Sequence, residues 1–352
     1  MTVKTDNSAK QPLVGLTREQ LEEYALSIGL KKFRGRQLYQ WLYKKNCGTF
    51  AEMTDLPADL RARLLNSAGI RQLTCLDTRG SEESGSVKYL FSLKDGECIE
   101  SVLIVDADRR TLCVSSQVGC ALNCRFCATA KLGFHRNLTA GEIIDQLLYI
   151  NHATGIPVSN VVFMGMGETF NNYQPVIKAA DIMSDQLGAS ISPRRIVIST
   201  AGVADKIIQY ADEGHKYRLA VSLNSPFQQE RLEWMPVARQ WDIDEVLKAS
   251  RYYTRISRKV LTFEYVLFAG LNDSRKHAAA LKKIPQSMPC KLNLIPYNAV
   301  DRCFQRPDPA MVDQFAQWLL PLRAGLSVRW SKGADINAAC GQLAGTFQKQ
   351  DH

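Results

Sequence analysis

The sequence lacks any run of about 18 or more apolar residues, which is the length that a membrane-spanning helix needs. Its first residues, MTVKTDNSAKQ, are polar and contain no apolar segment of the kind found in secretory signals. Internal repeats and low-complexity tracts are also absent. We therefore expect a cytoplasmic protein with no membrane association, in which the ten cysteines are thiols or metal ligands and any disulfide is transient.

An excess of positive charge is present but moderate, with 44 Lys and Arg against 35 Asp and Glu and a formal net charge of +9. This balance suits an ordinary basic enzyme as well as a protein with a polyanionic partner such as RNA. The candidates for RNA contact are residues 31–36, Arg109-Arg110, and residues 251–259, where tyrosines lie among arginines. A solvated helix face has the same pattern, so charge alone leaves both interpretations open.

At 352 residues the chain is longer than a typical single domain, and its hydrophobic fraction of 45% suits a sizeable core. We expect a disordered tail over residues 1–16. Residues 17–70 are predicted to form a helical, RNA-contacting domain whose first helix is capped by Thr17. The segment VKYLFSLKDGECIESVLIV alternates in polarity and contains Asp95-Gly96, a dipeptide typical of hairpin turns, which predicts a short β unit within residues 71–105.

From residue 106 to about residue 347, strand-like segments alternate with helical ones. The strand-like segments are TLCVSS, VSNVVFMG, RIVIST, RLAVSL, LTFEYVLF, KLNLIP and LSVRW. The clearest helix follows Thr139, which forms a capping box with Glu142, and this helix ends at Gly155. Repeated β–α units predict a parallel sheet, and six or so units are too few for a closed eight-fold barrel. The expected fold class is α/β, a partial (β/α)6 barrel with an N-terminal helical accessory domain and a short β linker unit.

Three cysteines lie close together in CALNCRFC, residues 120–127, with the spacing C-x3-C-x2-C. Three thiols in one turn cannot all pair, so a disulfide staple explains them poorly. The last two alone would fit a redox pair or half of a zinc site, but the x3 spacing is unusual for zinc and ferredoxin sites and no second CxxC follows. Three thiolates can hold three irons of a four-iron cluster and leave the fourth open for chemistry. We therefore predict that Cys120, Cys124 and Cys127 bind a [4Fe-4S] cluster.

Small and polar residues recur where the predicted strands stop. They occur at Cys113–Cys127, Gly165–Glu168, Ser199–Gly202, Ser222–Asn224 and Pro296–Asn298. Turn chemistry would explain any one of these, but in parallel β/α folds the working residues lie at the carboxyl ends of strands. Recurrence at five strand ends predicts one ligand site, where the two glycines of GMGE permit close approach of a backbone to the ligand.

The cysteine motif, with Phe126 before its last cysteine, resembles the signature of the radical S-adenosylmethionine (SAM) enzymes. The likeness extends further, through TLCVSSQVGCALNCRFCATA, FMGMGE, RRIVISTAG, LTFEYVLFAGLND, KLNLIPYN and INAACGQLAG, to the RlmN/Cfr-type radical SAM RNA adenine methyltransferases. It runs from FRGRQLYQWLY to about residue 347. Within that family the chain is most similar to the dual-specificity adenine carbon-2 methyltransferases.

The resemblance implies two cofactors, the [4Fe-4S] cluster and SAM, with two SAM molecules used per turnover. The implied SAM contacts are Gly167, Glu168, Ser199, Ser222, Leu223, Asn224 and Asn298, and Glu168 is expected to accept a hydrogen bond from the SAM amino group. The sequence departs from relatives at four positions. Thr169, Asn224, Trp330 and Asn337 stand where relatives often have proline, histidine, a basic residue and aspartate. The first two are expected beside SAM and the last two near Cys340.

The resemblance also implies catalytic roles for three residues. A hydrogen-bearing adenine ring carbon is not nucleophilic enough to take a methyl cation from SAM directly. In the family's scheme Cys340 takes the methyl group first, and a 5′-deoxyadenosyl radical then activates the S-methyl group for addition to carbon 2. Glu100, thirteen positions before Cys113, accepts the ring proton, and Cys113 attacks the Cys340 sulfur, which forms a transient disulfide. Without the resemblance, Cys113 reads as a buried strand residue and Glu100 as a solvent-facing carboxylate.

The implied substrates are an adenine near the peptidyl-transferase centre of 23S rRNA and the adenine 3′ of the anticodon in some tRNAs. An electron donor such as flavodoxin and a monomeric state are also expected. Three alternatives stay open. Methylation at adenine carbon 8 uses the same cysteines, a non-enzymatic iron–sulfur RNA-binding protein cleaves no SAM, and a different radical SAM enzyme such as a maturase cleaves SAM without needing Cys340.

Overall fold

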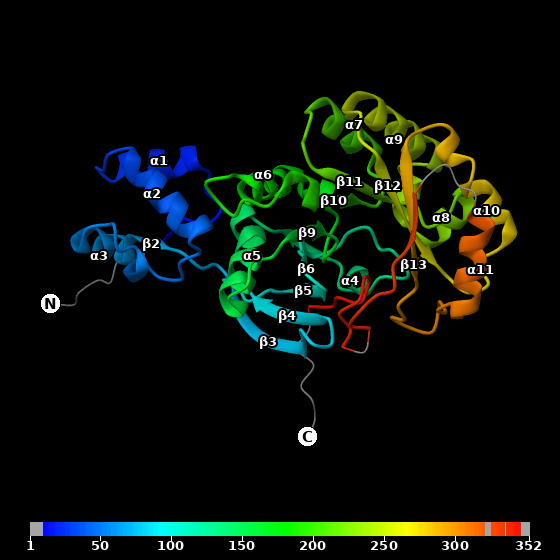
Figure 1. The fold of residues 1–352 in the computed structure, drawn as a ribbon, viewed down its shortest axis with the longest axis horizontal. Coiled ribbons are helices and arrows are strands. Elements are labelled where there is room, and N and C mark those ends of the chain that lie inside the picture. The colour runs from blue at the N-terminus through cyan, green and yellow to red at the C-terminus, as the bar shows by residue number, and fades with distance from the viewer. Residues whose placement is uncertain (1–9, 321–324, 335, 346–352) are drawn as a thin grey trace, which may run out of the picture.

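The computed structural model describes residues 10–320, 325–334 and 336–345 (Figure 1). Its main feature is a ten-stranded sheet in the order β14-β13-β12-β11-β10-β9-β6-β5-β4-β3. The strands from β6 to β14 in this sheet run parallel. They are β6 (Arg109–Cys113), β9 (Asn160–Phe163), β10 (Ile196–Thr200), β11 (Arg218–Ser222), β12 (Leu261–Leu267), β13 (Cys290–Pro296) and β14 (Gly325–Val328). Every strand predicted for the parallel region is therefore present.

Helices fill the crossovers between these strands. They are α5 (Ala140–Thr154), α6 (Tyr173–Ser184), α7 (Ala204–Asp212), α8 (Gln228–Trp234), α9 (Ile243–Ser257), α10 (Arg275–Leu281) and α11 (Pro309–Leu319). The predicted capping box of α5 is confirmed, because the Thr139 side chain accepts from the Glu142 N–H and Gly155 ends the helix at φ 66°. The strands are strongly apolar because helices cover them, and Leu219, Ala220 and Val221 of β11 are fully buried.

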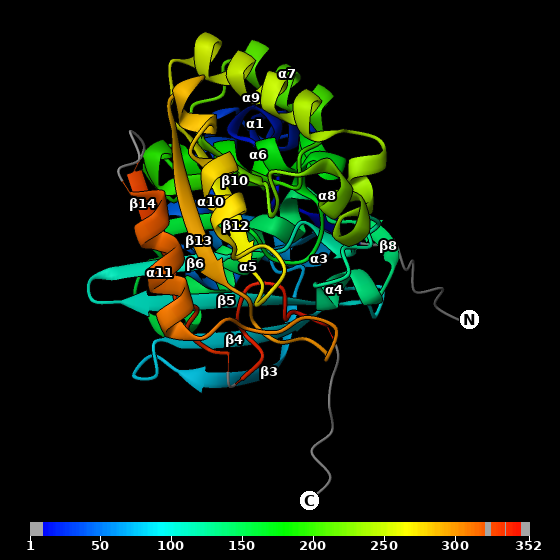
Figure 2. The ribbon, with the colours of Figure 1, turned by 90° about the vertical axis from the view of Figure 1, so that its right-hand side faces the viewer.

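An antiparallel unit extends the sheet beyond β6. It consists of β3 (Thr74–Ser81), β4 (Ser86–Ser92) and β5 (Cys98–Asp106), and β5 pairs with β6 so that Val102 lies opposite Cys113. The hairpin predicted at Asp95-Gly96 is confirmed, since Leu93 N–H donates to the Glu97 carbonyl at 2.8 Å across the turn. In the two views these strands and helices α7 and α9 lie at opposite ends of the molecule (Figures 1 and 2). The sheet is continuous across the predicted boundary at residue 105.

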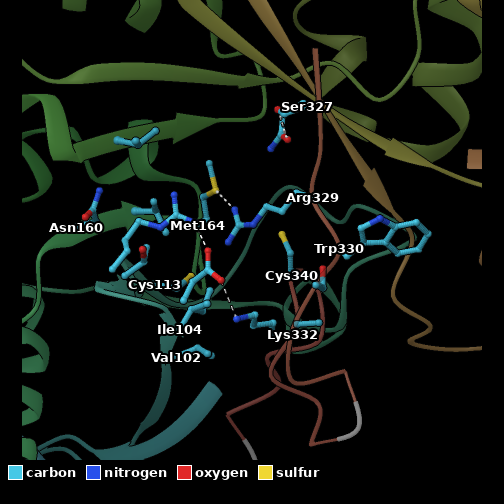
Figure 3. A pocket seen from close by; sticks show the side chains of 18 of the residues that line it. Val102, Ile104, Cys113, Asn160, Met164, Ser327, Arg329, Trp330, Lys332 and Cys340 are labelled. Carbon is cyan, nitrogen blue, oxygen red and sulfur yellow. Dashed lines mark hydrogen bonds and ion pairs between the residues drawn. The ribbon is translucent and has the colours of Figure 1, made fainter. Parts of the chain in front are cut away.

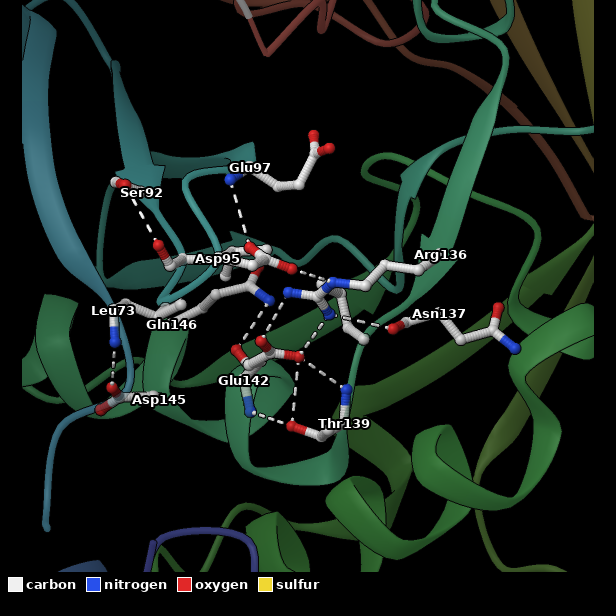
Figure 4. A network of polar contacts seen from close by, with 12 residues as sticks. Leu73, Ser92, Asp95, Glu97, Arg136, Asn137, Thr139, Glu142, Asp145 and Gln146 are labelled. Carbon is white, nitrogen blue, oxygen red and sulfur yellow. Dashed lines mark hydrogen bonds and ion pairs between the residues drawn. The ribbon is translucent and has the colours of Figure 1, made fainter. Parts of the chain in front are cut away.

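The N-terminal helices α1 (Arg18–Ser27), α2 (Phe33–Tyr39) and α3 (Ala58–Ser67) lie to one side of the sheet (Figure 1). Helix α1 begins at the predicted cap, where Thr17 accepts from the Gln20 N–H. The module is tied to α5 by Asp145, whose carboxylate accepts from the N–H groups of Gln72 at 2.7 Å and Leu73 at 3.1 Å (Figure 4).

The prediction of a disordered tail over residues 1–16 is wrong for its second half. Strand β1 (Gln11–Pro12) pairs with β2 (Ala68–Gly69), and Leu13 and Val14 are buried. These two apolar residues pack into the core, and the polar residues before them concealed that. Residues 1–9, and the end of the predicted core at 346–347, lie outside the described residues. Within the described ranges, no helix is long and apolar enough to cross a membrane.

Candidate active site

The three clustered cysteines lie in a loop held at its base by a short hairpin. Strands β7 (Gln117–Gly119) and β8 (Phe134–Asn137) pair antiparallel and enclose residues 120–133, with helix α4 (Ala128–Lys131) inside the loop. The Cys120 N–H donates to the Gly133 carbonyl at 2.7 Å. A Cβ on Gly119 would lie 1.8 Å from that carbonyl oxygen, and Gly119 has φ +70°. Only glycine fits this position, so the backbone itself sets where the cysteine loop begins.

A polar network fixes the second strand of that hairpin. Arg136 on β8 forms a two-pronged contact with Glu142 of α5, at 2.9 and 3.0 Å, and also donates to Asp95 at 2.5 Å (Figure 4). Glu142 in turn accepts from the backbone N–H of Thr139 at 2.8 Å. The paired carboxylates raise the pKa of Arg136 above its usual value. The cysteine loop is thus anchored both to α5 and to the β4–β5 turn.

The three cysteines are free thiols whose environment suits a positively charged metal cluster. Burial, together with the charges of Glu168 and of neighbouring cysteines, raises the pKa of Cys120 to about 12 and that of Cys124 well above its usual range. Iron bound at these sulfurs offsets that repulsion and holds the thiols deprotonated. Within the described part of the chain, no three metal-binding side chains converge as they do around a single ion.

The glycines after β9 pack against the protein itself, whereas the end of β13 carries a feature that suits a bound SAM. Gly165 and Gly167 have no room for a side chain, because a Cβ on either would lie within 2.6 Å of atoms of the 114–117 segment. The side-chain oxygen of Asn298 is buried and accepts no hydrogen bond from any described residue. A buried acceptor without a donor is costly, so this oxygen fits a donor group on a ligand.

Two of the residues expected to contact SAM are already engaged by the fold. Both oxygens of Glu168 accept backbone N–H groups, from Phe170 at 3.0 Å and from Ala201 at 2.8 Å. The side chain of Asn224 accepts from the Val266 N–H at 3.0 Å. These side chains hold the ends of β9, β10, β11 and β12 together, a positioning role that no sequence pattern predicted.

The structure shows a specific contact or backbone conformation at each of the four positions where the sequence departs from relatives. The Thr169 hydroxyl donates to the carbonyl of Ser199, a bond that proline cannot make. Asn224 and Asn337 have left-handed backbones, at φ 56° and 53°, which asparagine tolerates better than most residues. Trp330 is exposed and lies 5.6 Å from the Arg306 guanidinium.

Arg231 of α8 is a site residue that sequence analysis missed. Its side chain is fully buried, and its guanidinium donates to the carbonyls of Leu223, Ser222 and Ala201 at the ends of β10 and β11. Burial lowers the pKa of Arg231 to about 10, and the nearby Cys124 opposes this shift. A buried arginine that has no carboxylate partner in the described residues is unusual. Its burial is the property that distinguishes Arg231 from a surface arginine. Nothing in the local sequence, QQERLEW, distinguishes it from a solvated helix residue.

The segment that carries Cys340 lies over the cysteine loop. The Ala128 N–H donates to the Gly341 carbonyl at 2.7 Å, and the Thr129 hydroxyl donates to the Leu343 carbonyl at 2.7 Å. The Asn298 amide donates to the Cys340 carbonyl at 3.3 Å. The Cys340 segment, which lies more than 200 positions further along the chain, is therefore hydrogen-bonded directly to the loop of Cys120, Cys124 and Cys127.

Cys113 and Cys340 line the same cavity, which has a volume of about 440 Å³ (Figure 3). Burial raises the pKa of Cys113 to about 12. Cys340 is exposed to solvent in the cavity, and the desolvation by the atoms packed around it raises its pKa. The Arg329 guanidinium lowers the pKa of both cysteines. Arg329 lies between Met164 and Cys340 in this view, within 3.9 Å of the Met164 sulfur. It is the cation best placed to favour a thiolate at either cysteine, and the thiolate is the reactive form.

Taken alone, the place of Glu100 on an alternating strand indicated a carboxylate that faces solvent. The structure instead shows that Glu100 is buried. It is 2% exposed, pairs with Lys88 at 3.0 Å and accepts the Ala344 N–H at 2.8 Å. Lys88 also donates to the Asn337 carbonyl at 3.3 Å. Glu100 lies two residues from Val102, which faces Cys113, but it lines a separate cavity of about 170 Å³ under the Cys340 segment.

We expect Lys88→Met to lower the free energy of unfolding by roughly 3 to 5 kcal/mol, because it leaves the buried Glu100 carboxylate unpaired. Urea unfolding measures this. Lys94→Met removes an exposed lysine of the β4–β5 turn and should change stability by less than about 0.5 kcal/mol. Adding Glu100→Gln to Lys88→Met should recover part of the loss. Equal effects of the two lysine substitutions would contradict the buried ion pair.

Comparisons with known proteins support a specific family. Residues 11–70 match the family model described as "Ribosomal RNA large subunit methyltransferase N-terminal domain", and residues 114–281 match the radical SAM superfamily. The chain is 41% identical over 340 residues to the "Probable dual-specificity RNA methyltransferase RlmN" of Flavobacterium psychrophilum, covering 95% of this chain and 98% of that one. It is 40% identical over 341 residues to the "Dual-specificity RNA methyltransferase RlmN" of Geotalea uraniireducens, covering 97% and 98%.

This chain belongs to the RlmN family of radical SAM RNA methyltransferases. A solved radical SAM methyltransferase from Sphaerobacter thermophilus superposes with a TM-score of 0.91, at 38% identity, over 96% of this chain and all of that one. The predicted fold class, family and enzyme class are thereby confirmed. Membership of the radical SAM superfamily implies a [4Fe-4S] cluster and SAM as cofactors.

The RlmN-type fold brings most of the predicted site together. Cys120, Cys124 and Cys127 share one loop, the Cys340 segment is bonded to that loop, and Cys113 shares a cavity with Cys340. The hydroxyls of Ser199 and Ser222 make no hydrogen bond within the described residues and remain available to a ligand. Glu100 is the exception, because it is separated from the cysteine cavity by the Cys340 segment in this conformation.

Proposed function

We propose that this RlmN-family chain methylates carbon 2 of a specific adenine in 23S rRNA and of the adenine 3′ of the anticodon in tRNAs, through an S-methyl group on Cys340. One observation carries the proposal. Cys340 and Cys113 line a single cavity, and the Cys340 segment is hydrogen-bonded to the loop that bears the three clustered cysteines. The dual-specificity names of the relatives support the two RNA substrates.

The residues divide the reaction between them. Cys120, Cys124 and Cys127 hold the cluster. The space for SAM is lined by Gly167, Glu168, Ser199, Ser222, Leu223, Asn224 and Asn298. Cys340 attacks the methyl group of a first SAM as a thiolate, which Arg329 favours. When bound, the cluster and a second SAM supply the radical that removes one hydrogen atom from that S-methyl group. The resulting methylene group on Cys340 then bonds to carbon 2 of adenine, so the RNA becomes covalently attached to the protein.

Release of the product needs a base and a second thiol. Glu100 accepts the proton of carbon 2, and for this the Ala344 N–H and Lys88 contacts must loosen, since both now occupy its carboxylate. Together with this proton the radical adduct gives up one electron, which the electron-transfer partner accepts, and the aromatic ring is restored. The Cys113 thiolate then attacks the Cys340 sulfur and a disulfide forms between the two cysteines. The carbon–sulfur bond breaks with its electron pair on the released carbon, which takes a proton from solvent and becomes the methyl group. Forming the disulfide oxidises both cysteines, so an external thiol must reduce it before the next turnover.

Methylation assays on RNA test this proposal. Anaerobically reconstituted protein, given SAM, a reductant and either total tRNA or 23S rRNA fragments, should yield 2-methyladenosine on mass spectrometry of nuclease digests. The regioisomer 8-methyladenosine would favour the antibiotic-resistance type of activity instead. SAM cleavage without any methyladenosine would favour a different radical SAM enzyme, and RNA binding without 5′-deoxyadenosine would favour a non-enzymatic iron–sulfur protein.

We also propose that the enzyme acts in the cytoplasm as a monomer and receives electrons from a small redox protein such as flavodoxin. Radical formation from SAM consumes one electron, which such a redox protein would supply. Size-exclusion chromatography with light scattering measures the monomeric state, and reduced flavodoxin should replace a chemical reductant in the methylation assay.

A further inference from the structure

The basic segments that sequence analysis selected for RNA contact are largely neutralised within the chain. Lys32 and Arg36 both pair with Glu22, at 3.2 and 2.6 Å. Arg110 pairs with Glu82 at 2.5 Å. A cation that already faces a carboxylate contributes less to the binding of a polyanion, so the first two predicted segments account poorly for RNA affinity.

The third segment, residues 251–259, lies mostly on the outer helix α9. The Tyr252 hydroxyl donates to Asp212 at 2.6 Å, and the Arg255 guanidinium lies 5.4 Å from the centre of the Tyr252 ring. This ring is therefore already covered by a cation and is poorly available for stacking on a base. Arg251 remains exposed, but on the outer helical layer rather than at the cysteine cavity.

A different set of arginines carries unpaired charge. Arg194 and Arg195 lie in the turn just before β10, and Arg218 is the first residue of β11. All three are exposed, and their guanidinium groups make no hydrogen bond or ion pair within the part of the chain that the structure describes. We call them the arginine rim. They line the same 440 Å³ cavity as Cys113 and Cys340.

The cavity as a whole has a strong excess of positive charge. Its basic lining residues are Arg109, Arg194, Arg195, Arg218, Arg329 and Lys332, and Asp106 is the one carboxylate among the described lining residues. Asp106 is already bound, by Arg109 at 2.8 Å and by Lys332 at 3.1 Å. The three rim charges therefore have no counterion in the cavity, and low-dielectric walls extend their field along it.

The rim and Cys113 lie three strands apart in the sheet. Cys113 of β6 pairs with Val162 of β9, Val162 pairs with Val197 of β10, and Val197 pairs with Arg218 of β11. Three spacings between neighbouring strands amount to about 14 Å. A base that reaches Cys340 cannot also contact the rim, which therefore faces the backbone that continues from the target nucleotide.

We propose that the arginine rim binds phosphates of the RNA backbone that flank the target adenosine, and so guides a single-stranded RNA loop into the cysteine cavity. This inference rests on the proposed function, whose RNA substrate it places on the molecule. Guanidinium groups bind phosphate through paired N–H groups. The target adenine must leave its stack, at a cost of unstacking, and phosphate contacts outside the cavity offset that cost.

The test is RNA binding by full-length protein, measured by fluorescence anisotropy with a tRNA anticodon stem-loop over a range of salt. Arg195→Ala/Arg218→Ala should bind about tenfold more weakly at roughly 0.15 M salt, and its log–log salt slope should fall by about 1.4, since each phosphate contact on a single strand contributes about 0.7. Arg195→Lys/Arg218→Lys keeps the charge and should retain most of the slope.

A matched control removes two exposed basic residues that lie elsewhere. Lys248→Ala/Arg251→Ala takes the same charge from α9, where neither side chain has a partner in the described residues. This double variant should bind RNA within about twofold of the unsubstituted protein. Thermal melting of all variants identifies any that are misfolded. If the alanine variant of the rim is misfolded, the salt slope of Arg195→Lys/Arg218→Lys is compared with that of the unsubstituted protein instead.

The outcomes separate the rim from the proposed function. A rim variant that binds like the unsubstituted protein, or an equal loss in the α9 control, overturns the arginine rim even if the protein methylates RNA normally. Failure of the unsubstituted protein to produce methyladenosine overturns the proposed function instead, while a selective loss of affinity in the rim variant would still establish a phosphate site.

Discussion

Replacing Cys340 with alanine should abolish methylation of RNA, with product formation falling by at least about a thousandfold. The reason is chemical, because an adenine ring carbon that bears hydrogen cannot take a methyl cation from SAM, and Cys113 is the one other thiol among the described residues that line the cavity. The measurement is mass spectrometry of nuclease-digested RNA after anaerobic incubation with SAM and reductant.

Two controls make the Cys340→Ala result specific. Cys303→Ala changes an exposed cysteine outside the cavity and should methylate normally. The iron content of Cys340→Ala should match that of the unsubstituted protein, since its thiol is not one of the three in the cysteine loop. A Cys340→Ala variant that still forms 2-methyladenosine would remove the central residue from the scheme.

Replacing Cys113 with alanine should trap RNA on the protein. Without the second thiol, the bond between Cys340 and the methylene carbon has no internal nucleophile to break it, because Cys113 is the thiol that shares the cavity. Most of the enzyme should then carry RNA after a single turnover. Denaturing gel electrophoresis detects the adduct, and peptide mass spectrometry should locate it at residue 340.

The double variant Cys113→Ala/Cys340→Ala provides the control for trapping. It should form no adduct, because the attachment point is gone. Cys113→Ala protein that is free of covalent RNA after turnover, or an adduct at another residue, would contradict the assignment of the two thiols.

The parallel part of the fold was predicted well from the sequence, because short stretches of neighbouring residues determine its strands and helix ends. Apolar runs such as RLAVSL mark strands buried on both faces, and the Thr139–Glu142 capping box marks a helix start that needs no tertiary partner. Strand β3 was not predicted, since its exposure alternates along its whole length and its residues are largely polar. Leu13-Val14 was also missed, because its burial depends on packing against distant helices.

The sequence predicts those site residues whose role follows from their spacing in the chain. It does not predict residues whose role depends on being buried by distant parts of the fold. The C-x3-C-x2-C spacing identifies three metal ligands without any structure. By contrast, Arg231 and Lys88 look like ordinary surface residues, and only tertiary packing shows that one binds the strand-end carbonyls and the other the Glu100 carboxylate. Glu168 was expected to contact SAM, which stays a prediction, and only the structure shows that its carboxylate also joins two strand ends through backbone N–H groups.

The arginine rim was missed for a similar reason. Arg194 and Arg195 lie in a short turn and Arg218 stands alone, so none belongs to a dense basic run. The topology of the sheet brings the beginnings of β10 and β11 next to each other and opens them on the cysteine cavity. Charge clustering in space thus differs from charge clustering in sequence.

The most direct test of the account follows the hydrogen atoms of the transferred methyl group. The protein is first purified with SAM that carries a fully deuterated methyl group and is then allowed to turn over with RNA and the same labelled SAM. If the methyl group passes through Cys340 and loses one hydrogen there before it joins the RNA, the product 2-methyladenosine should contain two deuterium atoms and one hydrogen from solvent. A product that retains all three deuterium atoms would mean direct transfer from SAM to adenine and would contradict the role of Cys340.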